Sequence, residues 1–141
     1  MSHRCEDWLR GRDYRVATLD FAGGIGPAMV QVGAMLQWRE QFGYDLAPAS
    51  RSLDALRDGF DFRIADGGGM VLVLRGFASA WREDAAWCRG LLDIVTETSL
   101  RELALGCRFF AVLVLADAAS PLVGERLEGH VIPSPYSGHF G

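Results

Sequence analysis

The sequence predicts an α/β domain in which a three-stranded parallel sheet is covered by helices, in the order β-α-α-β-α-β. Three apolar runs predict the strands, at Val16–Asp20, Val71–Leu74 and Phe109–Leu115. The stretches between these runs carry apolar residues at helical spacing, and strands that alternate with helices favour parallel pairing. The last run has no polar alternation, which is typical of a strand that is buried on both faces of its sheet.

Two helices are expected between the first two strands. The glycine-rich turn Gly23–Gly26 leads to Pro27, which is suited to the first position of a helix. The apolar face of this helix is formed by Met29, Val32, Met35, Leu36 and Phe42. A loop follows over residues 43–51, and Ser52 is a suitable N-cap for a short second helix.

The short helix separates apolar from acidic residues. At 100° per residue the apolar residues share one arc, and the acidic residues share a second arc rotated by roughly 120°. The apolar arc holds Leu53, Leu56 and Phe60, and the acidic arc holds Asp54, Asp58 and Asp61. Like charges at i,i+4 destabilise a helix by roughly 0.2–0.5 kcal/mol, so local stability does not favour the acidic side. We expect it to be either a solvated face or a surface for a cationic partner.

A third helical stretch is expected before the last strand. Asp66–Gly69 predicts a turn into the second strand, and the stretch Trp81–Leu105 is mostly helical in its spacing. A Thr or Ser within Thr96–Ser99 could interrupt this stretch and cap a further helix. Gly106 is suited to ending it.

Length and composition limit the possible functions. The chain has 141 residues, of which half are hydrophobic and 23% are charged, so a disordered acidic chain is excluded. The net charge of −4 is unfavourable for contact with nucleic-acid phosphates or anionic membranes, and neither partner is expected. We expect one domain over residues 14–117, an N-terminal extension over 1–13 and a Gly-, Pro- and Ser-rich extension over 118–141.

The sequence predicts a cytoplasmic protein. Its first residues lack the apolar core of a secretory signal, and its apolar runs are too short to span a membrane. Cys5, Cys88 and Cys107 are an odd number without a Cys-x-x-Cys spacing, so we expect reduced thiols, with Cys107 buried.

Catalytic and cofactor-binding patterns are scarce, and the sequence does not predict an enzyme. The three histidines lie in the terminal segments, and no metal-ligand spacing is present. Asp54 and Asp58 have no nucleophile or metal ligand near them in the sequence, so no catalytic, metal or cofactor residues are predicted. The turn Gly23–Gly26 lacks the third glycine of a dinucleotide fingerprint. A small flavodoxin-like domain that binds a nucleotide or similar ligand at this turn stays an alternative.

Residues 53–58 also carry a family resemblance. Their sequence, Leu-Asp-Ala-Leu-Arg-Asp, resembles the Leu-Asp-Ala-Leu-x-Asp signature of barstar-like proteins, the intracellular inhibitors of secreted bacterial ribonucleases. Met70–Phe77 is similar to the strand that follows the signature in this family. Gly106-Cys107 followed by Phe109–Leu115 is similar to the step into the final strand. The resemblance covers roughly residues 14–117.

The resemblance implies that the short acidic helix and the loop before it bind a basic toxin. Carboxylates there would take the places of RNA phosphates in the toxin's cleft, with Asp58 as the main phosphate mimic and Asp54 as a supporting carboxylate. The chain would be an immunity protein, monomeric until bound. A scaffold domain without a toxin partner is a further alternative.

The sequence departs from the family pattern at several positions. Pro48–Ser52 stands where the family has Tyr-Tyr-Gly-x-Asn, although Tyr44, a few residues earlier, could partly substitute. Arg57 replaces an aromatic residue between the two carboxylates and would repel a cationic cleft. Near the end of the last helix, Glu102 lies next to the positions where the family has acidic groups. The sequence therefore predicts a diverged partner, bound through Asp54, Arg57, Asp58, Asp61, Tyr44 and Glu102.

Overall fold

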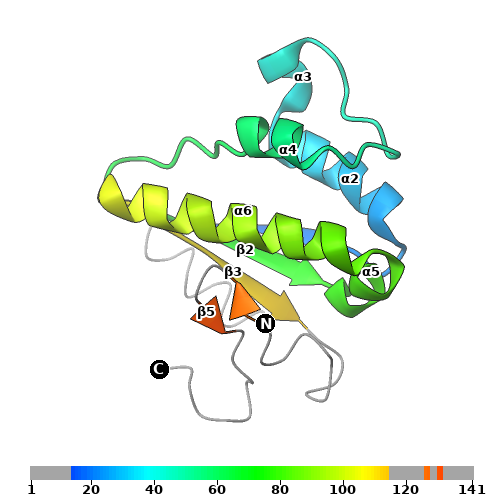
Figure 1. Cartoon of the computed structure of the whole chain (residues 1–141). Helices are drawn as coiled ribbons and strands as arrows, with labels where there is room; N and C mark the ends of the chain where they lie inside the picture. Colours follow the sequence, from blue (N-terminus) through cyan, green and yellow to red (C-terminus); the bar gives the residue numbers. More distant parts are fainter. Residues whose placement is uncertain (1–13, 115–125, 128–129, 132–141) are drawn as a thin grey trace.

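The three long strands form one parallel sheet, as the sequence predicts (Figure 1). The structure, a computed structural model, describes residues 14–114, 126–127 and 130–131. The strands are β1 (Tyr14–Asp20), β2 (Gly69–Arg75) and β3 (Arg108–Val114), in the order β1-β2-β3. Each strand begins one or two residues before its predicted start. Leu115, the predicted extension 1–13 and most of the predicted extension 118–141 lie outside the described residues.

The strand that is buried on both faces is β2, not β3. β2 is the middle strand, and its residues Gly69–Leu74 are all buried. β3 lies at the edge of the three-stranded sheet, and Phe110 is 39% exposed. The prediction that the last strand is buried on both faces is therefore wrong. An apolar run in the sequence does not reveal which strand is central.

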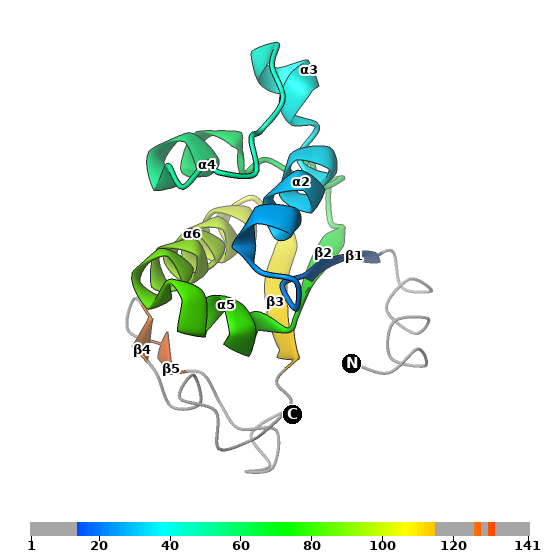
Figure 2. The same ribbon diagram turned by 90° about the vertical axis from the view of Figure 1, so that its right-hand side faces the viewer.

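Helices cover one face of the sheet (Figure 2). They are α2 (Ile25–Met35), α3 (Trp38–Phe42), α4 (Leu53–Gly59), α5 (Phe77–Glu83) and α6 (Ala85–Ala104). Leu19, Leu72 and Phe109 point from the three strands into one apolar core that these helices share. Beyond the sheet, β4 (Arg126–Leu127) and β5 (His130–Val131) form a short antiparallel pair, and β4 lies against α6. Within the described part of the chain, none of the helices could cross a membrane.

α2 begins and ends earlier than predicted. It starts at Ile25, so Pro27 is its third residue, where the first turn needs no backbone donor. After α2 the chain turns at Gln37, which adopts a left-handed conformation with φ of 51°, and α3 follows as a separate helix. Phe42 is therefore not on the apolar face of α2 and is partly exposed, whereas Trp38 is buried.

α6 is one continuous helix, so the interruption that the sequence allows at Thr96–Ser99 does not occur. The hydroxyl of Thr98 donates to the carbonyl of Ile94 at 2.8 Å, inside the helix, and so caps nothing. The interruption lies instead at Asp84, between α5 and α6, where the Asp84 carboxylate accepts from the backbone N–H of Trp87 at 3.0 Å. Gly106 ends the segment as predicted, with φ of 79°.

Candidate partner-binding surface

α4 is fixed to the domain by its cap and by close packing. The Ser52 hydroxyl oxygen accepts from the backbone N–H of Ala55 at 3.2 Å, which confirms the predicted N-cap. On its inner side Leu56 is buried, and Leu53 lies close against Gly90 of α6. At the other end Gly59 lies against the ring of Trp38, so closely that a side chain there would overlap the ring.

Two side chains hold the end of α4. Gln41 donates from Nε2 to the carbonyl of Gly59 at 3.1 Å, and Arg101 donates from Nη2 to the carbonyl of Phe60 at 3.0 Å. Phe60 follows the last helical residue and remains buried, as predicted, although it is not on the helix. The short helix is therefore anchored at both ends rather than supported only by its own hydrogen bonds.

The outward side of α4 presents two carboxylates one turn apart. The Asp54 side chain is 98% exposed, and Asp58 is also exposed. Asp58 makes no hydrogen bond or ion pair with the described residues. The structure therefore places both residues together on a solvent-facing surface, where the sequence expects them.

Arg57 is bound within the same surface by two acidic residues. Its Nε donates to Oε2 of Glu97 on α6 at 2.8 Å, and its Nη1 lies 3.4 Å from Oδ1 of Asp54. The hydrogen bond to Glu97 and the charges of Glu97, Asp54 and Asp58 raise the pKa of Arg57. Glu97 is not among the predicted site residues, because it lies 40 positions after Arg57 in the sequence. The one sequence signal for it is that it lies one helical turn before Arg101, a position that the comparison with the family pattern already singles out.

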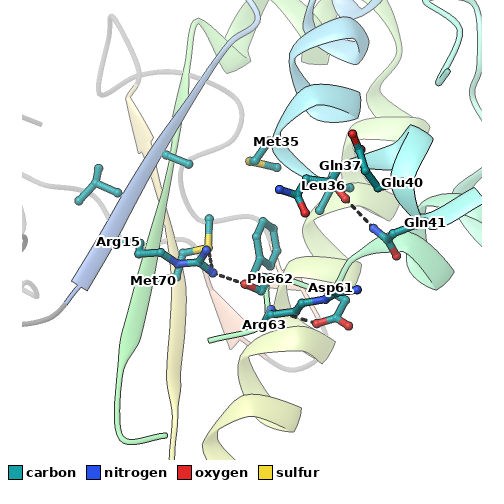
Figure 3. A pocket seen from close by; sticks show the side chains of 12 residues that line it. Arg15, Met35, Leu36, Gln37, Glu40, Gln41, Asp61, Phe62, Arg63 and Met70 are labelled. Carbon is teal, nitrogen blue, oxygen red and sulfur yellow. Dashed lines mark hydrogen bonds between the residues drawn. The ribbon is translucent and has the colours of Figure 1, made fainter. Parts of the chain in front are cut away.

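Asp61 does not belong to the acidic side of α4. The helix ends at Gly59, and the Asp61 carboxylate accepts from the backbone N–H of Arg63 at 3.1 Å in the following loop. Asp61 lines a cavity of about 370 Å³ between β1, the α2–α3 junction and this loop (Figure 3). None of the residues that line this cavity belongs to α4. The predicted acidic stripe is thus reduced to Asp54 and Asp58.

The cavity itself has both charged and apolar walls. Arg15 of β1 donates to the carbonyl of Phe62 and lies 3.9 Å from the sulfur of Met70 (Figure 3). Gln37 and Arg63, which both have positive φ, also line the cavity. Because Arg and carboxylate side chains both line it, the cavity has no preference for one ligand charge.

Tyr44 and Glu102 contact residues other than the α4 carboxylates. Tyr44 is exposed in the loop before α4, and its ring contacts the ring of Phe42 at 6.3 Å between centroids. Glu102 is only 8% exposed, and its carboxylate lies 3.9 Å from Nε of Arg101. The burial of Glu102 argues against a role in binding a partner.

The glycine-rich turn Gly23–Gly26 is already occupied by an internal carboxylate. Oε1 of Glu83 accepts from the backbone N–H of Ile25 at 3.0 Å, at the start of α2. Oε2 of the same residue lies 3.8 Å from Nη2 of Arg51. A helix N-terminus attracts anions, and here the protein supplies its own. This arrangement disfavours a nucleotide phosphate at the turn.

Arg51 also takes part in holding the loop that leads to α4. Its Nη1 donates to the carbonyls of Pro48 and Ser50 at 2.7 and 2.8 Å, and its guanidinium lies 6.0 Å from the centre of the Trp87 ring. The loop therefore keeps a defined course without the Tyr-Tyr-Gly-x-Asn segment.

The described residues form no metal centre, and comparison with known proteins identifies no relative. The described residues include no group of His, Cys, Asp and Glu side chains that could hold a metal ion. Cys88 and Cys107 are free and buried, as predicted for Cys107. Comparison with family models, with curated proteins and with solved structures finds no match. The barstar-like resemblance therefore stays a prediction that rests on the residues quoted for it.

Proposed function

We propose that the chain is an immunity protein that binds and blocks a cationic toxin of the ribonuclease type through the carboxylates of α4. The observation that carries this proposal is Asp58, an exposed carboxylate that makes no ion pair with any described residue, on a helix anchored at both ends. Asp54 lies one turn away. Such an inhibitor would act as a monomer in the cytoplasm, where the toxin is made.

The physical basis is electrostatic complementarity with little rearrangement. A carboxylate on a fixed helix loses little conformational freedom on binding, so more of its interaction with Arg or Lys appears as affinity. Asp54, Asp58 and Glu97 together outnumber Arg57 and Arg101, so the net charge of this part of the surface is negative. Such a surface attracts a basic partner over a distance and raises the association rate at low salt.

Arg57 is compatible with this proposal. Taken alone in the sequence, its charge would repel a cationic cleft. In the fold its guanidinium faces Glu97 and Asp54, and it holds Glu97 beside α4. Arg57 therefore serves to position two carboxylates, and we propose that it is not itself the partner-contacting group.

The proposal is tested by immobilising the chain and recovering what it retains from the secreted proteins of its source organism. The retained protein is then assayed for ribonuclease activity with and without the chain. We expect a basic protein that the chain inhibits. Asp58→Ala should weaken binding by roughly 2–5 kcal/mol if Asp58 is desolvated against cationic groups, and added salt should slow association.

Asp66→Ala is the matched control, because Asp66 is an exposed aspartate in the turn before β2 and its loss changes the net charge equally. It should leave binding almost unchanged. Equal weakening by both substitutions would show a general charge effect instead of a site on α4. A retained protein that binds equally well to the Asp58→Ala variant would favour a scaffold role.

A further inference from the structure

The cavity between β1, the α2–α3 junction and the loop after α4 has walls of two kinds (Figure 3). Half of the described residues that line it are apolar, namely Val16, Ala17, Met35, Leu36, Phe62 and Met70. Its charged lining consists of two guanidinium groups and two carboxylates, from Arg15, Arg63, Glu40 and Asp61. The volume of about 370 Å³ lies near the lower limit of small-molecule sites in proteins, which measure roughly 300–1,000 Å³. The cavity therefore suits a small ligand that has both a charged and an apolar part.

The charged groups of the cavity have bonding capacity to spare. The guanidinium of Arg63 makes no hydrogen bond or ion pair with the described residues, and only the backbone N–H of this residue donates, to Asp61. Arg15 bonds through Nη2 alone, to the carbonyl of Phe62, so its Nε and Nη1 keep their N–H donors. The carboxylate of Glu40 is exposed and forms no ion pair within the described part of the chain. Cationic donors and an anionic acceptor are thus both available to a ligand.

Two residues keep their side chains in the cavity at a conformational cost. Among the described residues, Gln37 and Arg63 are the two non-glycine residues with positive φ, at 51° and 47°. The left-handed region is sterically unfavourable for a residue with a Cβ atom. The other described positions with positive φ are all glycine, at Gly24, Gly43, Gly67, Gly76 and Gly106. Both exceptions line this cavity, and strained residues of this kind concentrate at ligand-binding sites, which indicates that the two side chains serve binding rather than stability.

We propose that the cavity binds a free α-amino acid with an apolar side chain. Arg15 and Arg63 bind the ligand carboxylate, because guanidinium groups bind carboxylates through paired N–H donors. Glu40 binds the ligand ammonium group, and the apolar lining receives the side chain. A ligand with one charge would leave the opposite charges of the wall without a partner, which favours a zwitterion. None of the described lining residues belongs to α4, so this proposal is independent of toxin binding.

The experiment uses L-phenylalanine as the probe and methyl NMR of the methionines as the readout. Met35 and Met70 line the cavity, whereas Met29 is buried in the core without lining it and serves as the internal reference. We expect saturable shifts of the Met35 and Met70 methyl signals and no shift of the Met29 signal. Three matched compounds each lack one part of the ligand: 3-phenylpropionate the ammonium group, phenethylamine the carboxylate, and glycine the apolar side chain. Each should bind at least tenfold more weakly.

Arg63→Gly separates binding from stability. It removes the guanidinium and the strain but keeps the backbone N–H that donates to Asp61. We expect the affinity for L-phenylalanine to fall at least tenfold and the urea midpoint of the free protein to rise. Glu40→Gln should weaken the binding of L-phenylalanine but not that of 3-phenylpropionate. Arg39→Ala is the control and should leave binding unchanged, because Arg39 lies on α3 but pairs with Asp45 and does not line the cavity.

Four results would contradict the proposal. If L-phenylalanine causes no saturable shift at Met35 and Met70, the cavity does not take an amino acid. Equal binding of 3-phenylpropionate and L-phenylalanine would identify a site for a simple carboxylate. A lower urea midpoint for Arg63→Gly would show that the Arg63 side chain supports the fold. Unchanged binding of L-phenylalanine by the Glu40→Gln variant would show that the ammonium group is not bound.

Discussion

Replacing Arg57 with Ala should lower the stability of the domain and speed its association with a cationic partner. Arg57 donates to Glu97 through two nitrogens, at 2.8 and 3.4 Å, and the two side chains are 44% and 41% exposed. Exposed ion pairs contribute roughly 0.2–1 kcal/mol, and this two-point geometry joins α4 to α6, so we expect a loss of about 1 kcal/mol. The substitution also adds one negative charge to the surface. At about 10 Å in water, one charge interacts with another by about 0.4 kcal/mol, so association should be about twofold faster at low salt.

Urea unfolding and stopped-flow binding at low and high salt measure the two effects. A double-mutant cycle with Glu97→Ala isolates the ion pair from other consequences of shortening the side chain. Arg39→Ala is the control for net charge, because Arg39 pairs with Asp45 at 3.1 Å on a highly exposed part of α3. A coupling below about 0.2 kcal/mol would contradict the stabilising role of the pair. Slower association of the Arg57→Ala variant would show instead that the partner binds Arg57 directly.

Two further predictions concern the core around α4 and α6. Gly59→Ala would place a Cβ atom 2.3 Å from the buried ring of Trp38, so we expect a loss of about 2–3 kcal/mol in urea unfolding, whereas Gly23→Ala, with its nearest neighbour at 3.9 Å, should have little effect. Burial raises the pKa of the Cys88 thiol to about 12, with smaller contributions from the carboxylates near it. The thiol of an unfolded cysteine has a pKa of about 8.5. Above that pH the unfolded state loses its proton while the folded state keeps it, so the free energy of unfolding falls by up to about 1.4 kcal/mol per pH unit until the pH approaches about 12. Below a pH of about 8.5 the contribution of Cys88 to the free energy of unfolding is fully present. In the Cys88→Ala variant the free energy of unfolding should therefore fall less steeply between a pH of about 8.5 and about 12. The chain has no lysine, so no lysine ammonium group titrates in this range and the effect of Cys88 is easier to measure.

The elements that local pattern determines were predicted well. The three strands and their parallel pairing follow from apolar runs separated by helical spacing, and the cap at Ser52 follows from its position before an apolar residue. Burial could not be predicted in the same way. The runs of β2 and β3 look alike in sequence, and only the sheet order makes β2 the buried one.

The candidate site was predicted in part, because its anchors are distant in sequence. Helical spacing extends the acidic stripe to Asp61, whereas the packing of Gly59 against Trp38 and the burial of Phe60 end the helix before it. In the sequence Arg57 is a positive charge between two carboxylates, Asp54 and Asp58. In the fold its charge is balanced by Asp54 and Glu97. The difference comes from Glu97, 40 residues away, which no local pattern connects to α4.

Substitutions of Glu83 test the two classes of binding site that the sequence leaves open, a protein partner at α4 and a nucleotide at Gly23–Gly26. Glu83→Ala removes the acceptor of the Ile25 N–H and the partner of Arg51, so we expect a loss of about 1–2 kcal/mol in the free energy of unfolding. Glu83→Gln can keep the acceptor and lose only the charge, so it should cost less than half as much. With the carboxylate gone, the first turn of α2 and Arg51 face an empty position for an anion.

Phosphate at constant ionic strength should therefore stabilise the Glu83→Ala variant against urea and leave the parent chain unaffected. If phosphate or a nucleotide stabilises the parent chain as much as the variant, the carboxylate does not fill the site. A ligand would then bind at Gly23–Gly26 in the native protein, and the nucleotide-binding alternative would replace the toxin-binding one.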